Sequence, residues 1–100
     1  MGEVEETLQR IEAQGSVIGT IVANTDGIPI RSSFDNSKAG KYVDSLRQLT
    51  WMARCTVRDI DPENELVVLR ISTKNQEIMV GPENGYLLIL LQRFEKYSRT

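Results

Sequence analysis

Histidine and cysteine, which often act as general base, nucleophile or metal ligand, are almost absent from this 100-residue sequence. Histidine is absent, so the commonest general base and metal ligand is missing. The single cysteine, Cys55, therefore has no histidine to activate it, and we interpret it as a small packed side chain on a helix. One cysteine also cannot form an internal disulfide, which fits a reducing compartment. Nucleophilic catalysis is not expected.

Carboxylates and glycines offer no stronger signal. Asp59, Asp61 and Glu63 cluster where a helix is expected to end, but they lack the dense oxygen-ligand loop of an EF-hand, so helix capping and turn formation explain them better than a metal. The glycines between positions 15 and 27 do not stand in a phosphate-binding spacing. The sequence predicts no catalytic site, no metal and no cofactor.

Composition favours one globular domain over residues 1–100, in which 93–100 is a polar tail expected to fray. Apolar residues make up 40% and charged residues 26%, which is ordinary for a folded domain. The net charge of −2 argues against nucleic acid as a partner. No apolar run approaches the roughly 20 residues of a membrane helix, and the acidic N-terminus does not resemble a signal peptide. The expected location is the cytoplasm, without membrane insertion.

Periodicity and turn signals predict an α/β domain in the order αββαβββ. The 28–34 segment contains Pro29, which is tolerated on an edge strand, and the 86–91 segment is apolar on both faces, as in a central strand. Asn36 and Ser37 are candidate N-caps for the long helix, and Asp61-Pro62 ends it. The expected elements are a helix over 3–14, strands over 17–23 and 28–34, a helix over 38–60, and strands over 66–71, 76–80 and 86–91.

The long helix has two apolar faces when its residues are placed at steps of about 100°. One face is expected to pack on the sheet. It consists of Tyr42, Leu46, Leu49, Ala53, Val57 and Ile60. The other face carries an apolar patch with two polar residues among its members, flanked by a row of arginines. The patch is Trp51, Met52 and Cys55 with Asp44 and Gln48, and the row is Arg47, Arg54 and Arg58.

Two interpretations of this second face stay open. Trp51 could cover loops of its own chain, or it could be buried in a contact with another protein, where Trp and Arg are enriched. The edge strand favours the second interpretation, because an uncovered edge invites pairing with another strand. A two-fold homodimer joining strand to strand and helix to helix would satisfy both surfaces. The strand residues expected at this dimer and partner interface are Ile30, Arg31, Ser32, Ser33 and Phe34. The helix residues expected there are Asp44, Arg47, Gln48, Trp51, Met52, Arg54, Cys55 and Arg58.

Three blocks of this sequence resemble the roadblock-type dynein light chains, within a similarity that extends from Val4 to about Gln92. They are Asn24–Ile30, Ala53–Pro62 and Glu77–Val80. The resemblance implies a five-stranded, mostly antiparallel sheet with one helix on each face. It implies a dimer formed through the second strand and the long helix, with Trp51, Met52 and Cys55 near the two-fold contact.

The same resemblance implies a non-catalytic subunit of the dynein motor complex. Its partners would be itself or an isoform, and a helical segment of the dynein intermediate chain. Its location would be on the microtubule cytoskeleton, in cytoplasmic or axonemal dynein. Other members of the roadblock superfamily suggest an alternative with the same fold, a scaffold or regulator of a small GTPase.

Overall fold

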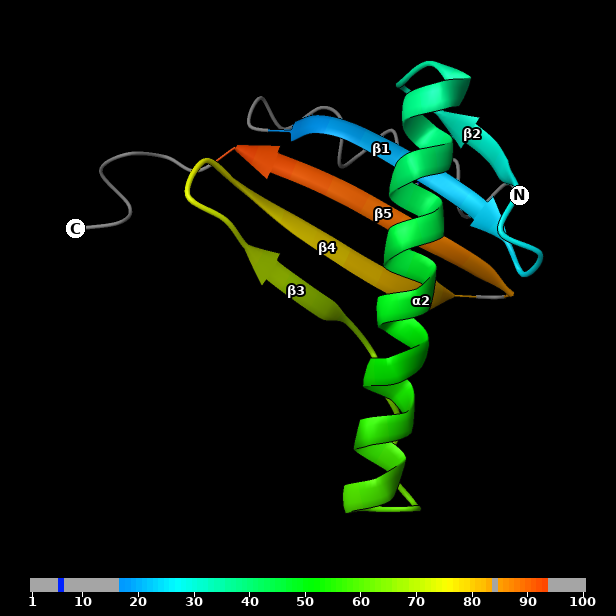
Figure 1. The fold of residues 1–100 in the computed structure, drawn as a ribbon, viewed down its shortest axis with the longest axis vertical. Coiled ribbons are helices and arrows are strands. Elements are labelled where there is room, and N and C mark those ends of the chain that lie inside the picture. The colour runs from blue at the N-terminus through cyan, green and yellow to red at the C-terminus, as the bar shows by residue number, and fades with distance from the viewer. Residues whose placement is uncertain (1–5, 7–16, 84, 94–100) are drawn as a thin grey trace.

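The computed structural model describes residues 6, 17–83 and 85–93. Five strands form one sheet in the order β2-β1-β5-β4-β3, and each neighbouring pair is antiparallel (Figure 1). A long helix lies on one face of this sheet. The elements are β1 (Val17–Asn24), β2 (Pro29–Ser32), α2 (Asn36–Ile60), β3 (Leu69–Ser72), β4 (Gln76–Glu83) and β5 (Tyr86–Arg93).

The predicted fold class is confirmed, and so are two strand positions. The apolar strand β5 lies in the centre of the sheet, and the strand that begins at Pro29 lies at an edge. The centre of the core follows from the register. Ile89 of β5 lies opposite both Ile21 of β1 and Val80 of β4, and all three side chains are buried. Burial of three such side chains contributes several kcal/mol, at about 1.5–3 kcal/mol each.

A tight turn joins β1 to β2, as the sequence predicts. The Asn24 side-chain oxygen accepts hydrogen bonds of 3.0 Å from the backbone N–H groups of Asp26 and Ile28. Gly27 adopts a φ of 81°, a conformation that glycine takes at little cost. Because a Cβ on Gly27 would also meet the Arg47 side chain, this turn lies against helix α2.

Helix α2 begins two residues earlier than the predicted start at 38. Its N-cap is Asp35, not Asn36 or Ser37, because the Asp35 carboxylate accepts a 2.8 Å hydrogen bond from the backbone N–H of Lys38. The predicted end is confirmed. Asp61 adopts an extended conformation before Pro62, and its N–H still bonds to the carbonyl of Val57.

The face of α2 that packs on the sheet differs from the predicted stripe. Leu46 is buried as predicted, but Leu49 is 40% exposed and Ile60 is 81% exposed. The buried positions are Ala39, Val43, Leu46 and Thr50. Tyr42, Ala53 and Val57 are only partly buried. The packed face is therefore rotated about the helix axis relative to the predicted stripe, with which it shares Leu46 and the partly buried Tyr42.

The length of α2 accounts for the exposure of Ile60. Its 25 residues extend about 38 Å at 1.5 Å per residue. Five strands at about 4.8 Å spacing give a sheet only about 19 Å wide between its outer strands. Figure 1 shows the second half of the helix continuing beyond the sheet. Residues on that half have no sheet beneath them, whatever their hydrophobicity.

The predicted N-terminal helix over 3–14 and the polar tail over 94–100 fall outside the described residues, apart from Glu6. Within the described part of the chain, no helix is long and apolar enough to cross a membrane.

Candidate protein-binding site

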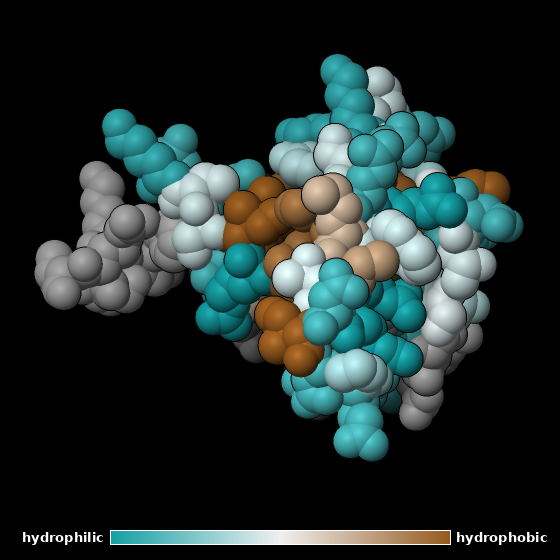
Figure 2. Space-filling view, turned by 60° about the horizontal axis from the view of Figure 1, so that its bottom comes forward, coloured by the Kyte–Doolittle hydropathy of each residue, from teal (hydrophilic) through white to brown (hydrophobic). Residues whose placement is uncertain are grey.

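The second half of α2, residues 51–60, contains no buried residue. Trp51 and Met52 are each 63% exposed, although both are large and apolar. Exposed apolar side chains continue into the chain that leads from α2 to β3, where Val67 is 73% and Val68 is 49% exposed. A cluster of exposed apolar side chains of this kind is typical of protein interaction sites. Figure 2, viewed from the side toward which the helix projects, shows apolar residues among hydrophilic ones.

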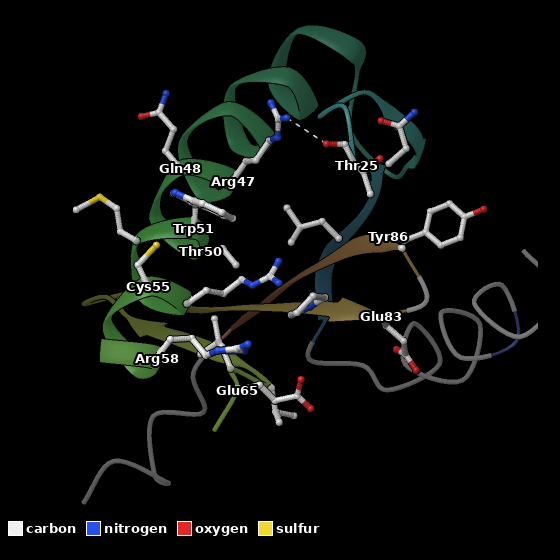
Figure 3. A pocket seen from close by; sticks show the side chains of 18 of the residues that line it. Thr25, Arg47, Gln48, Thr50, Trp51, Cys55, Arg58, Glu65, Glu83 and Tyr86 are labelled. Carbon is white, nitrogen blue, oxygen red and sulfur yellow. Dashed lines mark hydrogen bonds between the residues drawn. The ribbon is translucent and has the colours of Figure 1, made fainter. Parts of the chain in front are cut away.

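A groove of about 1490 Å³ runs along one side of α2. One wall is the helix itself. The remaining walls are the β1–β2 turn, the chain just before β3, and the turn between β4 and β5 (Figure 3). Off the helix, the lining residues are Asn24, Thr25, Glu65, Leu66, Val67, Pro82, Glu83, Gly85, Tyr86 and Leu87.

The structure brings together all eight helix residues that the sequence assigned to an interface. They line this one groove, and they are Asp44, Arg47, Gln48, Trp51, Met52, Arg54, Cys55 and Arg58. Trp51 does not drape over its own chain, since most of its surface is exposed. It lies in the open on the groove wall, with Thr50 and Cys55 as neighbours (Figure 3).

The predicted strand residues do not join this groove. Strand β2 lies at one edge of the sheet and β3 at the other. Ser33 bonds to the backbone of Thr20, and its N–H donates to the Thr20 carbonyl at 3.0 Å. The ring of Phe34 packs against the core, 5.6 Å from the ring of Tyr42, and fills the space above Gly19. Ser33 and Phe34 thus have clear roles within their own domain.

The arginine row makes different contacts along its length. Arg47 donates a 3.1 Å hydrogen bond to the backbone carbonyl of Thr25, which ties the helix to the β1–β2 turn. The Arg54 guanidinium lies 5.9 Å from the centroid of the Trp51 ring, a cation–π distance. Across the described residues, no carboxylate lies within ion-pair distance of Arg47, Arg54 or Arg58. Their charges remain available to another molecule.

Thr50 marks the boundary between the two halves of the helix and lines the same groove. It is 4% exposed, and its hydroxyl oxygen has no hydrogen-bond partner among the residues that the structure describes. A buried hydroxyl without a partner costs about 1–3 kcal/mol. Hydrophobic periodicity could not predict that Thr50 is buried, because threonine is not counted among the apolar residues.

Sequence reasoning also missed the other walls of the groove. The sequence predicts Leu66 and Tyr86 as the first residues of two strands, and Glu83 as part of the loop before the second of them. Leu66 and Val67 follow the helix closely in sequence, but Glu83 and Tyr86 lie far from it, and only the fold brings all four beside its exposed half. In the part of the chain that the structure describes, no group of histidine, cysteine or carboxylate side chains could hold a metal ion.

Comparison with known proteins identifies the class to which this fold belongs. The model of the Roadblock/LC7 domain family matches residues 3–93. The chain therefore belongs to the Roadblock/LC7 family, which is generally non-catalytic and includes dynein light chains and small-GTPase regulators.

A solved structure has the same fold. It is the Roadblock/LC7 domain from Streptomyces avermitilis, which superposes with a TM-score of 0.72 at 12% sequence identity. The match covers 78% of this chain and 67% of the other. At that identity the likeness concerns the fold alone.

Proposed function

We propose that this chain is a non-catalytic light chain of the dynein motor complex, active as a homodimer that binds a helical segment of the dynein intermediate chain. Family membership supports the class, and the three sequence blocks that resemble dynein light chains favour this branch of it. The observation that carries the proposal is the unpacked second half of α2. Its exposed tryptophan, methionine and arginines match the composition of binding surfaces.

A second copy of the chain would cover the apolar side chains that lie outside the groove. Leu49 and Ile60 lie on the flank of α2 away from the arginines, and Val68 directly precedes β3. The β3 edge is only four residues long and has no neighbour on its outer side in the described chain. Pairing of this edge with its copy would extend the sheet across two subunits.

This geometry makes a stronger case for the β3 edge than for the β2 edge that the sequence suggests. Strand β2 is the outermost strand at the other side of the described sheet, and its Ile30 is 44% exposed. The first half of α2 contacts β2, whereas the second half extends past the sheet. A contact through β2 would leave most of the exposed helix uncovered.

Light scattering on the full chain tests the dimer, and a monomer at micromolar concentration would exclude it. The two edges are distinguished by Val68→Glu and Ile30→Glu, which place the same charge on each. If the dimer uses the β3 edge, Val68→Glu gives monomers and Ile30→Glu does not. The reverse result would assign the contact to β2.

Co-purification from a native extract tests the partner. Recovery of the dynein intermediate chain with the wild-type protein is the expected result. Recovery of a small GTPase without any dynein chain would instead favour the alternative, a GTPase scaffold or regulator with the same fold. The expected location, on microtubules in the cytoplasm, follows from the first outcome and fails with the second.

A further inference from the structure

We infer that the groove beside α2 selects its occupant by charge, and that it accepts an amphipathic helix of a partner protein with one acidic face. This inference rests on the proposed function in one respect, that the groove is the surface that holds the partner segment. It adds the chemical class of that segment, which neither the family nor the fold assigns.

The spacing of the groove residues on α2 forms a straight row. Arg47, Trp51, Arg54 and Arg58 follow one another at intervals of four, three and four residues, which places them on one side of a helix. From Arg47 to Arg58 the helix rises by eleven residue steps, or about 17 Å along its axis. A partner helix of about three turns would match that length, so carboxylates on successive turns of it could meet the arginines.

Each guanidinium group in this row keeps N–H donors that make no hydrogen bond to the described residues. Arg47 uses one nitrogen for the Thr25 carbonyl, and Arg54 stacks near the ring of Trp51. For Arg58 no polar contact is present among the described residues. A planar guanidinium with free N–H groups recognises a carboxylate through two parallel hydrogen bonds. Acidic side chains are therefore the natural partners of this wall.

The opposite walls of the groove restrict the occupant further. Glu65 and Glu83 lie across from the helix (Figure 3). On α2 itself, Asp44 precedes the arginine row in the sequence and Asp59 follows it. A segment that is acidic on all sides would be repelled by the carboxylates of Glu65 and Glu83. The charges therefore favour a segment whose acidic face is turned toward α2 and whose other faces are not acidic.

Apolar residues between the charged walls provide the remaining contact. Trp51 is exposed on the helix wall, and Leu66 and Leu87 line the groove from outside the helix. An amphipathic helix could bury apolar side chains against these three while its carboxylates face the arginines. A flat, fully polar ligand would leave the indole uncovered.

Two synthetic peptides test the inference on the intact chain. Both are amphipathic helices of about 18 residues, five turns, with the same leucine positions. One carries glutamate on its polar face and the other carries lysine at the same positions. Anisotropy of a dye on the peptide measures affinity. Emission of Trp51, the only tryptophan in the sequence, reports whether the peptide occupies the groove.

We expect the glutamate peptide to bind at least about tenfold tighter than the lysine peptide, as two or three partly exposed ion pairs would give. Its affinity should fall as salt is raised, and the Trp51 emission should shift to the blue. In the double variant Arg54→Glu with Arg58→Glu the preference should reverse. Failure of both peptides to bind the wild type, or a lysine preference, would overturn the inference.

A matched control separates the local effect from the net charge. Lys41→Glu with Lys74→Glu changes the net charge by the same amount, and both lysines are exposed and lie outside the groove. This control should keep the glutamate preference. If it loses that preference as fully as the arginine variant does, the groove is not the selective element. Circular dichroism checks that every variant remains folded.

The charge selection and the dynein assignment can be tested separately, because either one can hold when the other does not. If the extract yields no intermediate chain but the glutamate peptide binds as described, the charge selection stands and the partner is a different protein. If the intermediate chain is recovered equally well by the arginine double variant, the dynein proposal stands and the charge selection falls.

Discussion

The two halves of helix α2 belong to one continuous element, yet they have opposite surroundings. The first half supplies every fully buried residue of the helix, and the second half supplies none. The difference does not come from hydrophobicity, because the exposed half contains tryptophan, methionine and isoleucine. It comes from the width of the sheet, which ends before the helix does. One half therefore stabilises the domain, and the other is free for association.

The largest contrast between the halves should appear when one large side chain is truncated in each. Leu46→Ala removes a buried side chain from the core and is expected to lower the free energy of unfolding by about 2–5 kcal/mol. Met52→Ala is expected to change it by less than about 0.5 kcal/mol. Urea denaturation followed by circular dichroism, in dilute solution, measures both. Equal losses would contradict the division of the helix.

A charge in the exposed half should affect association and leave the fold intact. Trp51→Asp replaces the exposed indole of the groove with a carboxylate beside the proposed acidic segment. The free energy of binding to the intermediate chain should become less favourable by at least about 2 kcal/mol, as when a tryptophan at the centre of an interface is truncated. Ser45→Asp adds the same charge to an exposed position outside the groove and should bind normally. Unchanged binding by Trp51→Asp would remove Trp51 from the partner surface.

The start of the first half depends on its cap. Asp35→Ala removes the carboxylate that accepts from the N–H of Lys38, and should cost about 1 kcal/mol of stability. Asp35→Asn keeps a side-chain oxygen at the same place and should cost little. Thermal denaturation of the two variants side by side makes the comparison. A similar loss in both would mean that the charge of Asp35, and not its hydrogen bond, stabilises the helix.

The smallest effect is expected at the boundary between the halves. Thr50→Val replaces a buried hydroxyl that lacks a partner with a methyl group of similar size, and should stabilise the domain by about 1 kcal/mol or less. Thr56→Val is the matched change in the exposed half, where the hydroxyl donates a 2.9 Å hydrogen bond to the Met52 carbonyl. Thr56→Val should not increase the stability of the domain, because it removes this hydrogen bond. A loss on Thr50→Val would indicate that this hydroxyl has a partner in solution.

Several features of the fold could be predicted because their causes are local. Pro29 lacks a backbone donor and marks an edge strand, and Gly27 permits the turn before it. Pro62 ends the long helix for the same kind of reason. The helix residues of the candidate site were also predictable, because spacing alone places Arg47, Arg54 and Arg58 on one side of α2.

Strand limits were less predictable because they depend on the neighbouring strand. The chain from Leu66 to Val68 is apolar and predicts a strand, yet β3 begins at Leu69, opposite Val80. Continuing the antiparallel register would bring Val67 opposite Pro82, which has no N–H to donate to the ladder. Val67 and Val68 therefore stay outside the sheet and exposed because Pro82 of β4 cannot donate a hydrogen bond to them.

The sequence by itself determined the order of elements, the family and the two-faced character of the long helix, because periodicity and turn chemistry act over a few neighbouring residues. The tertiary structure alone decided which face of that helix packs, since burial requires a sheet underneath. It turned Thr50 inward and left Ile60 in solvent. It also formed a groove beside the arginine row with residues from three other segments of the chain, which no local pattern connects.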